Sequence, residues 1–114
     1  MGQNVTRAVP LNTPHVDAFV SPSTATTTQI AAAVAGQRYR VLSFICSSVA
    51  AQTFQFTSNA TPIAATLHIG AGPVIVAPFT EHGWFETAIG EALQVVTTAA
   101  TPSGIQVQYI ALWS

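Results

Sequence analysis

Three of the four acidic residues of the chain lie in one segment, TEHGWFETAIGEAL (residues 80–93). Two carboxylates that converge on one bond can act as general acid and general base, so Glu81, Glu86 and Glu91 are the first candidates for chemistry. Each is five residues from the next. That spacing turns neighbouring side chains to opposite faces of a strand and to different sides of a helix. Without a bend, no two of these carboxylates share a face.

The glycines of this segment could supply such a bend, so a hydrolase that uses Glu81 and Glu86 stays an alternative. The more common role of isolated acids is to be solvated or to pair with a cation, and Arg38 or Arg40 would be the partner. No nucleophile motif or phosphate-binding loop is present. We therefore predict no catalytic residue and no enzymatic activity.

The same segment contains a possible pair of metal ligands. His82 and Glu86 are four residues apart, which suits one face of a helix, but a glycine between them makes a helix a poor prediction. His15 and His68 are scattered, and the single cysteine, Cys46, lies in an apolar run. A lone cysteine forms no intramolecular disulfide and is most often a small buried apolar residue. We predict no metal site and no cofactor.

Aromatic residues surround the acidic segment. Exposed, Phe79, Trp84 and Phe85 could stack on a sugar ring; buried, they would anchor a loop or a subunit interface, where aromatic residues are enriched. The second role is the more common one. Trp84 and Phe85 are therefore predicted interface residues, and a carbohydrate-binding surface is the alternative.

The chain is poor in charge. Charged residues make up 6% of its 114 residues and apolar residues 49%, with a net charge of −1. It has no lysine and only three arginines, too few for a phosphate-binding stripe, so we predict no nucleic-acid binding. Its longest apolar stretch is too short to span a membrane, and its start lacks a signal-peptide pattern. A nearly uncharged surface favours a subunit of an assembly, and a monomer kept soluble by hydroxyl and amide groups is the alternative.

The first 27 residues show no sustained period and contain three of the seven prolines. This is typical of an extended segment, so we predict an N-terminal arm over residues 1–27 and one domain over residues 28–114. Apolar residues are spaced along the arm, and we expect them to be buried on its own domain or on a neighbour; a solvated terminus is the alternative. The predicted interface residues of the arm are Val9, Leu11, Val16, Phe19 and Val20.

The rest of the chain alternates between short β patterns and turns. Strand patterns cover residues 28–34, 38–49, 53–57, 63–69, 74–79, 91–99 and 105–113. Sequences rich in Gly, Pro, Asn and Ser separate most of them. The stretch 38–49 is apolar on both faces in its middle, as expected of a central strand. Turns at intervals of about 8–12 residues predict an all-β fold, a single β-sandwich of jelly-roll-like type.

Residues 35–112 resemble the small β-sandwich proteins found in the structural modules of tailed bacteriophages. The resemblance is carried by AGQRYRVLSF, by the Phe-rich TFQFT, by GWFETAIGEAL and by the closing strand GIQVQYIAL. In that pattern Gly83 and Gly90 permit turns, while Phe85 and Leu93 face the core. Trp84 is an addition that the pattern does not define.

The resemblance implies a virion structural protein, in particular a capsid decoration (cement) protein that binds the outside of a phage head and stabilises neighbouring capsomers. The implied partners are the major capsid protein and further copies of the chain, as a homotrimer or dimer, with no membrane contact. The implied location is the capsid exterior, after assembly in the host cytoplasm. A tail or fibre component and a carbohydrate (receptor)-binding β-sandwich module are the alternatives.

Overall fold

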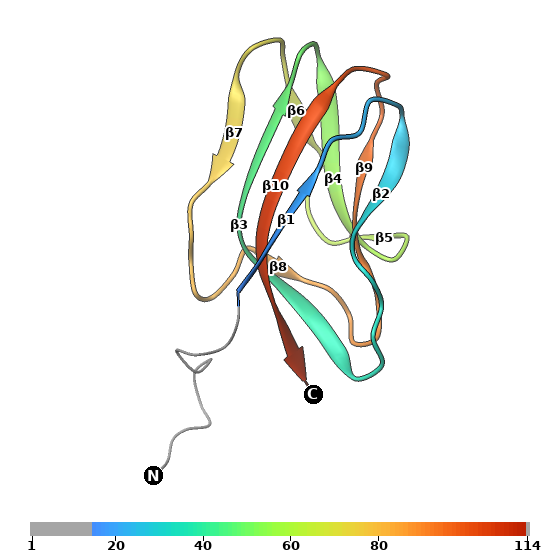
Figure 1. The fold of residues 1–114 in the computed structure, drawn as a ribbon, viewed down its shortest axis with the longest axis vertical. Coiled ribbons are helices and arrows are strands. Elements are labelled where there is room, and N and C mark those ends of the chain that lie inside the picture. Colours follow the sequence, from blue (N-terminus) through green and yellow to red (C-terminus); the bar gives the residue numbers. More distant parts are fainter. Residues whose placement is uncertain (1–14, 114) are drawn as a thin grey trace.

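The computed structural model describes residues 15–113, and all regular elements among them are strands (Figure 1). None of these residues belongs to a helix that could cross a membrane. The strands are β1 (Val16–Val20), β2 (Thr26–Ala31), β3 (Gln37–Ser48), β4 (Gln52–Ser58), β5 (Thr61–Pro62), β6 (Leu67–Ile69), β7 (Val74–Ala77), β8 (Phe85–Glu86), β9 (Leu93–Thr97) and β10 (Ser103–Trp113).

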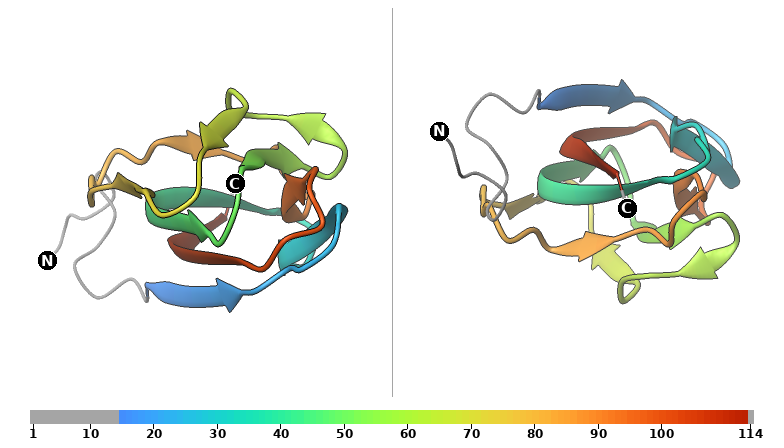
Figure 2. Two further views of the ribbon diagram at one scale, coloured as in Figure 1. Left: turned by 90° about the horizontal axis from the view of Figure 1, so that it is seen from above. Right: turned by 90° about the horizontal axis from the view of Figure 1, so that it is seen from below.

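These strands form two antiparallel sheets that pack in layers (Figure 2). Sheet A has the order β1-β10-β3-β7, and β8 pairs with β3 beyond the end of β7. Sheet B has the order β2-β9-β4-β5, and β6 also pairs with β4. The chain crosses between the sheets six times: from β1 to β2, β2 to β3, β3 to β4, β6 to β7, β8 to β9 and β9 to β10. The predicted all-β sandwich is confirmed.

The core between the sheets is built from alternate residues of the strands, as the period of a pleated strand requires. Phe54 and Phe56 of β4 and Leu93 and Val95 of β9 point inward and are fully buried. The ring of Phe56 lies 5.0 Å from that of Phe44, which comes from sheet A. Aromatic contacts of this kind join the two sheets at the centre of the molecule.

A β-bulge in β3 explains why the middle of this strand is apolar on both faces. The register between β3 and β10 shifts at Leu42, which has no direct partner on β10. Before the bulge Tyr39 and Val41 belong to the core, and after it Phe44 and Cys46 do. The inward-facing residues thus change from odd to even numbers, because one extra residue enters the bulged strand.

The sandwich begins earlier than the sequence predicts. Val16–Val20 form β1 and pair with β10, and Thr26–Ala31 form β2 and pair with β9. Alternation places Val20 toward the core, against which it packs, and turns Phe19 outward. The predicted boundary at residue 27 is therefore corrected: residues 16–27 supply β1 and the first two residues of β2. The rest of the predicted arm, with Val9 and Leu11, lies outside the described residues.

Several other strands are shorter than their sequence patterns. Only Leu67–Ile69 of the predicted stretch 63–69 pairs as a strand, and only Leu93–Thr97 of the stretch 91–99 does. The acidic segment contains one short strand, Phe85–Glu86. In each case strand length is set by the neighbour available for pairing rather than by local composition.

The reactivity of the Cys46 thiol can be used to test whether the core is buried as described. Its side chain is 0% exposed, and burial raises the pKa of its thiol from 9.0 to about 12. Because the thiolate is the reactive form, we expect reaction with a disulfide reagent at about pH 8 to be at least about a thousandfold slower in the native protein than in denaturant. The measurement is the absorbance change on thiol exchange.

The same shift gives a pH dependence of stability. Above pH 9.0 the unfolded thiol ionises while the folded thiol does not, so its contribution to the free energy of unfolding falls between pH 9.0 and about 12. Cys46→Ala should lack this contribution. A native thiol that reacts as fast as the denatured one would contradict the described packing.

Candidate functional site

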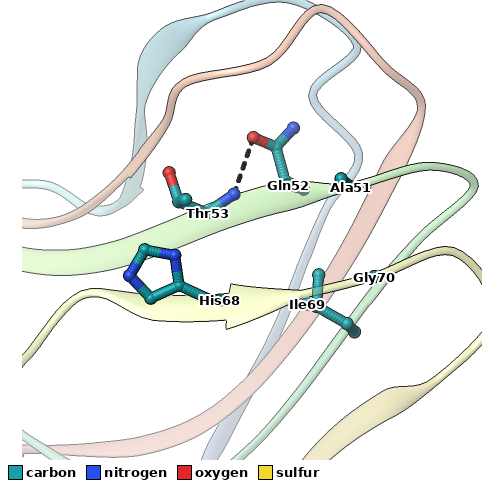
Figure 3. Close-up of a pocket in the computed structure, with 6 residues that line it drawn as sticks. All are labelled: Ala51, Gln52, Thr53, His68, Ile69 and Gly70. Atoms are coloured by element: carbon teal, nitrogen blue, oxygen red, sulfur yellow. Dashed lines mark hydrogen bonds between the residues drawn. The ribbon is translucent and has the colours of Figure 1, made fainter.

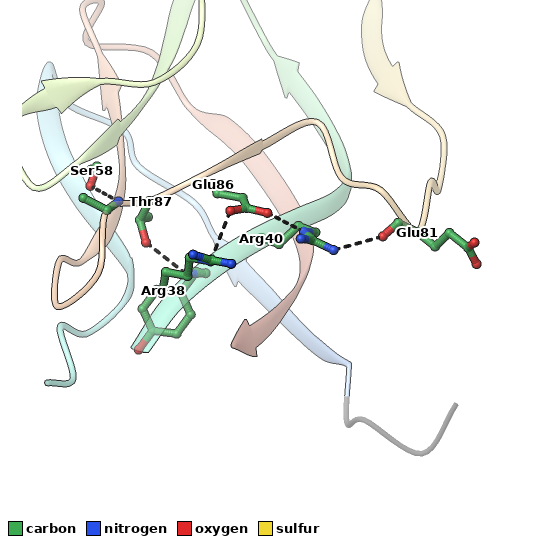
Figure 4. A network of polar contacts seen from close by, with 8 residues as sticks. Arg38, Arg40, Ser58, Glu81, Glu86 and Thr87 are labelled. Carbon is green, nitrogen blue, oxygen red and sulfur yellow. Dashed lines mark hydrogen bonds and ion pairs between the residues drawn. The ribbon is translucent and has the colours of Figure 1, made fainter. Parts of the chain in front are cut away.

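The three glutamates of the acidic segment lie in three different environments. Figure 4 shows two of them, Glu81 and Glu86. Glu86 Oε2 accepts a hydrogen bond from Arg40 Nε at 2.5 Å, and its Oε1 lies 3.2 Å from Arg38 Nε in an ion pair. Glu81 is exposed, and only its backbone oxygen meets Arg40, 3.5 Å from Nη1. Glu91 accepts a hydrogen bond from the Ser58 hydroxyl. The predicted pairing of an acid with Arg38 and Arg40 is thus observed at Glu86.

Backbone and hydroxyl contacts fasten this segment to both sheets. Thr87 Oγ1 accepts a hydrogen bond from the backbone N–H of Tyr39 at 2.9 Å, in sheet A. Ser58 Oγ accepts one from the N–H of Ala88 at 2.9 Å, in sheet B. The segment is a connector that ties the layers together, and its carboxylates do not share a hydrogen-bond partner.

Histidines form no cluster in the described part of the chain. His15 stacks beside Phe79 at 5.8 Å, His82 is exposed in the loop, and His68 is exposed on β6. Among residues 15–113 no three His, Cys, Asp or Glu side chains are grouped as metal ligands.

An open hollow of about 450 Å³ lies beside His68, where β4 and β6 pair (Figure 3). Its lining amide, Gln52, is already used: Nε2 donates to the Ala99 carbonyl at 2.8 Å, and Oε1 accepts from the N–H groups of Thr98 and Ala99. This amide secures the loop before β10, so the hollow offers little free polar chemistry.

The two predicted aromatic interface residues have different surroundings. Phe85 is partly buried, and its ring lies 5.8 Å from Phe44 and 5.0 Å from Phe56, within the core. Trp84 is 48% exposed. Its indole Nε1 donates to the Pro78 carbonyl at 2.9 Å, which fixes the ring at the edge of sheet A. Trp84 therefore presents a half-exposed aromatic ring whose orientation is fixed by a hydrogen bond.

Two apolar residues outside the main core are also buried. Leu42 and Ile110 are each only 1% exposed, yet neither belongs to the core between the sheets. Pairing with Arg40 turns Ile110 to the outer side of sheet A. The rings of His15 and Phe79 meet although their chain segments flank opposite edges of that sheet. Near the β-bulge, side chains of the outer face are therefore covered by the protein's own groups.

The upper part of that face carries an exposed apolar patch. The strand register aligns Phe19, Gln106, Ile45 and Val76 in one row across β1, β10, β3 and β7, and Val74 lies in the next row. Phe19 is 69% exposed and Val76 61%. We call Phe19, Ile45, Val74 and Val76 the apolar patch. Such a row departs from the polar outer face expected of an antiparallel sheet with one solvated side.

Two hollows of about 220 Å³ each lie along β10, one on either side of Gln106. The first, the Phe19 hollow, is lined by Phe19, Val20, Ser21, Ile45, Ser47, Gly104, Ile105 and Gln106. The second, the Asp17 hollow, is lined by Asp17, Ser43, Phe44, Ile45, Gln106 and Gln108. The absence of a side chain at Gly104 opens the first hollow, and the exposed carboxylate of Asp17 gives the second a negative wall.

Sequence reasoning found only one member of the patch, Phe19. Ile45, Val74 and Val76 read as ordinary strand residues, because an apolar run does not tell which face of the sheet is covered. A signal was available in VIVA (residues 74–77), whose successive apolar residues exceed what a strand with one buried face needs. Of the other predicted interface residues in the described chain, Val16 is exposed on β1 and Val20 packs against the core.

Comparisons with known proteins give a fold likeness and no family. No protein-family model and no curated protein sequence matches the chain. Its structure is similar to the Tobacco streak virus coat protein, with a TM-score of 0.50 and 12% identity over 96% of this chain and 91% of that one. That likeness shows the β-sandwich fold alone.

Two further similar structures have TM-scores below 0.5. One comes from Bacillus endospore appendages, described as disulfide-linked pili, with a TM-score of 0.49 and 17% identity over 97% of this chain and 98% of that one. The other is the C-terminal domain of EclA, a sugar-binding protein, with a TM-score of 0.44 and 13% identity over 94% of this chain and 83% of that one.

Two glycines of the connector (residues 80–93), Gly83 and Gly90, allow a matched pair of variants to be compared. Gly83 has φ +80°, and an added Cβ would lie 2.4 Å from Arg40 Cγ; Gly90 has φ +79° with nothing within 4 Å. We expect Gly90→Ala to lower the free energy of unfolding by about 1–2 kcal/mol, because of its left-handed backbone alone. Gly83→Ala should cost about 1–3 kcal/mol more, since Arg40 must leave its place beside Glu86.

Urea unfolding measures both variants against the parent chain, with an unchanged denaturant slope as the check that the folded state is intact. Equal losses for Gly83→Ala and Gly90→Ala would mean that Arg40 moves aside without cost.

Proposed function

We propose that this protein is a virion structural protein, and specifically a capsid decoration protein that binds the outside of a phage head and stabilises neighbouring capsomers. Its partners would be the major capsid protein and further copies of itself, at the capsid exterior. The proposal assigns it no catalysis. Its work would be mechanical, since many small contacts repeated by symmetry resist separation of the capsomers through avidity.

The apolar patch is the observation that carries this proposal. Phe19, Ile45 and Val76 expose apolar surface on three different strands of one rigid sheet. Only 6% of the residues are charged, so there is little charge repulsion to oppose contact between this surface and a neighbouring protein. The sequence resemblance to phage structural modules supports the same function, and the coat protein with the similar fold shows that such a sandwich can build a virus shell.

Charge placed on the patch should weaken binding to the head. For Ile45→Glu combined with Val76→Glu, we expect the affinity for heads stripped of this protein to fall at least about a hundredfold, because two carboxylates would be desolvated in an apolar contact. Co-sedimentation with the heads of the virus that encodes the chain measures the loss.

The matched control is Gln55→Glu with Gln94→Glu, which adds the same charge to part-exposed positions on sheet B. This control should bind within about threefold of the parent, as expected for surface changes outside an interface. A reconstruction of the virion that shows the chain in the tail, or does not contain it, would contradict the proposal.

A carbohydrate-binding module is the second candidate, and the held ring of Trp84 is the observation that favours it. Its N–H is bonded to Pro78 and one side of the ring meets Phe44 edge-on at 6.3 Å, so the exposed part is fixed in place before any ligand arrives. Phe79, 53% exposed, lies in the same loop. A preordered aromatic surface suits stacking on a sugar ring.

Trp84→Ala tests this candidate. If the protein binds glycans, the change should weaken binding at least about tenfold, the loss expected for one stacking ring. Trp113→Ala, which removes another exposed tryptophan, is the control and should leave binding unchanged. Glycan-array fluorescence gives the readout; no binding by the parent chain would remove the candidate.

A further inference from the structure

The apolar patch requires a cover of matching shape and charge. Its row crosses four strands and is interrupted only by Gln106, and the hollows on either side of that residue are open. The charged residue that lines them is Asp17. The cover should therefore be a narrow, mostly apolar segment with one positive charge.

We propose that this cover is the segment 5–11 of a second copy of the chain, which lies extended over the outer face of sheet A. Val9 would enter the Phe19 hollow and Arg7 the Asp17 hollow. The inference deepens the proposed function, because it names a second copy as the occupant of the patch. It is tested without capsids, so its failure and that of the proposed function can be told apart.

The sequence of the segment has the pattern that such a cover needs. In VTRAVPL, alternate residues are Val5, Arg7, Val9 and Leu11. An extended chain turns alternate side chains to one face, so three apolar groups and one guanidinium would face the sheet together, with Val9 at the Phe19 hollow and Arg7 at the Asp17 hollow. The proline in the segment is no obstacle to docking on a sheet face, because that contact needs no backbone N–H.

The spacing of the hollows fits the same pattern. They share Gln106 as their common wall, with Gly104 in one lining and Gln108 in the other. Features one strand period apart are separated by about 7 Å, which is also the separation of alternate side chains on an incoming extended chain. Arg7 and Val9, two residues apart, can therefore occupy the two hollows at once.

Charge selects the partner of Asp17. Within the described chain Asp17 is exposed and forms no ion pair. Arg38 and Arg40 are both engaged by Glu86. Arg7 is the remaining arginine of the sequence, and the chain has no lysine. A planar guanidinium against a carboxylate gives the contact both direction and register.

Distance along the chain favours a second copy over the same one. Only residues 12–14 separate Leu11 from His15, which precedes β1. A segment that folds back through residues 12–14 would run antiparallel to β1 and would place Val9 beside Asp17 and Arg7 beside Phe19, which is the reverse of the proposed fit. A segment from another copy has no such constraint and can bring Arg7 to the carboxylate.

A charge exchange tests the pairing in the full-length chain. Arg7→Glu and Asp17→Arg should each weaken self-association at least about tenfold, and the chain carrying both changes should recover to within about threefold of the parent. Sedimentation equilibrium over a range of protein concentrations measures the association, and thermal unfolding checks that each variant is folded. A parent chain that stays monomeric, or a double variant as weak as the singles, overturns the inference.

Crosslinking tests the placement of Val9. A chain with Val9→Cys is mixed with a size-tagged chain with Ser47→Cys, since Ser47 lines the Phe19 hollow. Oxidation should give a disulfide-linked heterodimer on a non-reducing gel. Mixtures with a Thr27→Cys chain, exposed on sheet B, and with the parent chain, whose Cys46 is buried, should give none.

The chain carrying both cysteines separates the two geometries. An intrachain disulfide that forms at every protein concentration would place the segment on its own domain and overturn the inference. If self-association fails while binding to heads persists, the inference is wrong and the proposed function stands. If self-association holds and heads are not bound, the reverse is true.

Discussion

The pairing of β3 with β10 is the constraint on which the rest of the molecule depends. All 11 residues of β10 pair with β3, and together they form the centre of sheet A. β1 can pair only because β10 is in place, and β7 and β8 both use the other edge of β3. A slip of one residue in this pairing would turn the core residues outward, and the exposed apolar residues would no longer be aligned in one row.

The bulge at Leu42 divides sheet A into two regions that differ in what covers their outer face. On one side of it the outer face is occupied by the protein's own groups: Glu86 with its two arginines, and the rings of His15 and Phe79. On the other side the apolar patch is uncovered. The same strand thus supports one region covered by the protein's own groups and one that exposes apolar side chains, and the proposed assembly rests on the second region.

Most of the sandwich could be predicted from strand period and turn residues, because these are local properties. The exceptions are long-range in origin. β1 was hidden because Phe19 faces outward, so its apolar residues do not alternate as a strand with one buried face should. β8 is two residues long and exists only through its pairing with Arg40 and Val41. The apolar patch depends on a register across four strands that no local pattern contains. The pairing of Glu86 with an arginine, in contrast, could be predicted, because the chain has so few charged residues that Arg38 and Arg40 are among the few possible partners.

The late position of β10 in the sequence has a consequence for biosynthesis. Sheet A cannot close while β10 is still inside the ribosome, so β3 must wait through the synthesis of six intervening strands, including the Phe-rich β4. During that interval the apolar residues of several strands are exposed to solvent, and unpaired strands are prone to aggregate. Folding speed and chaperone supply, rather than final stability, would then limit the yield of this small sandwich.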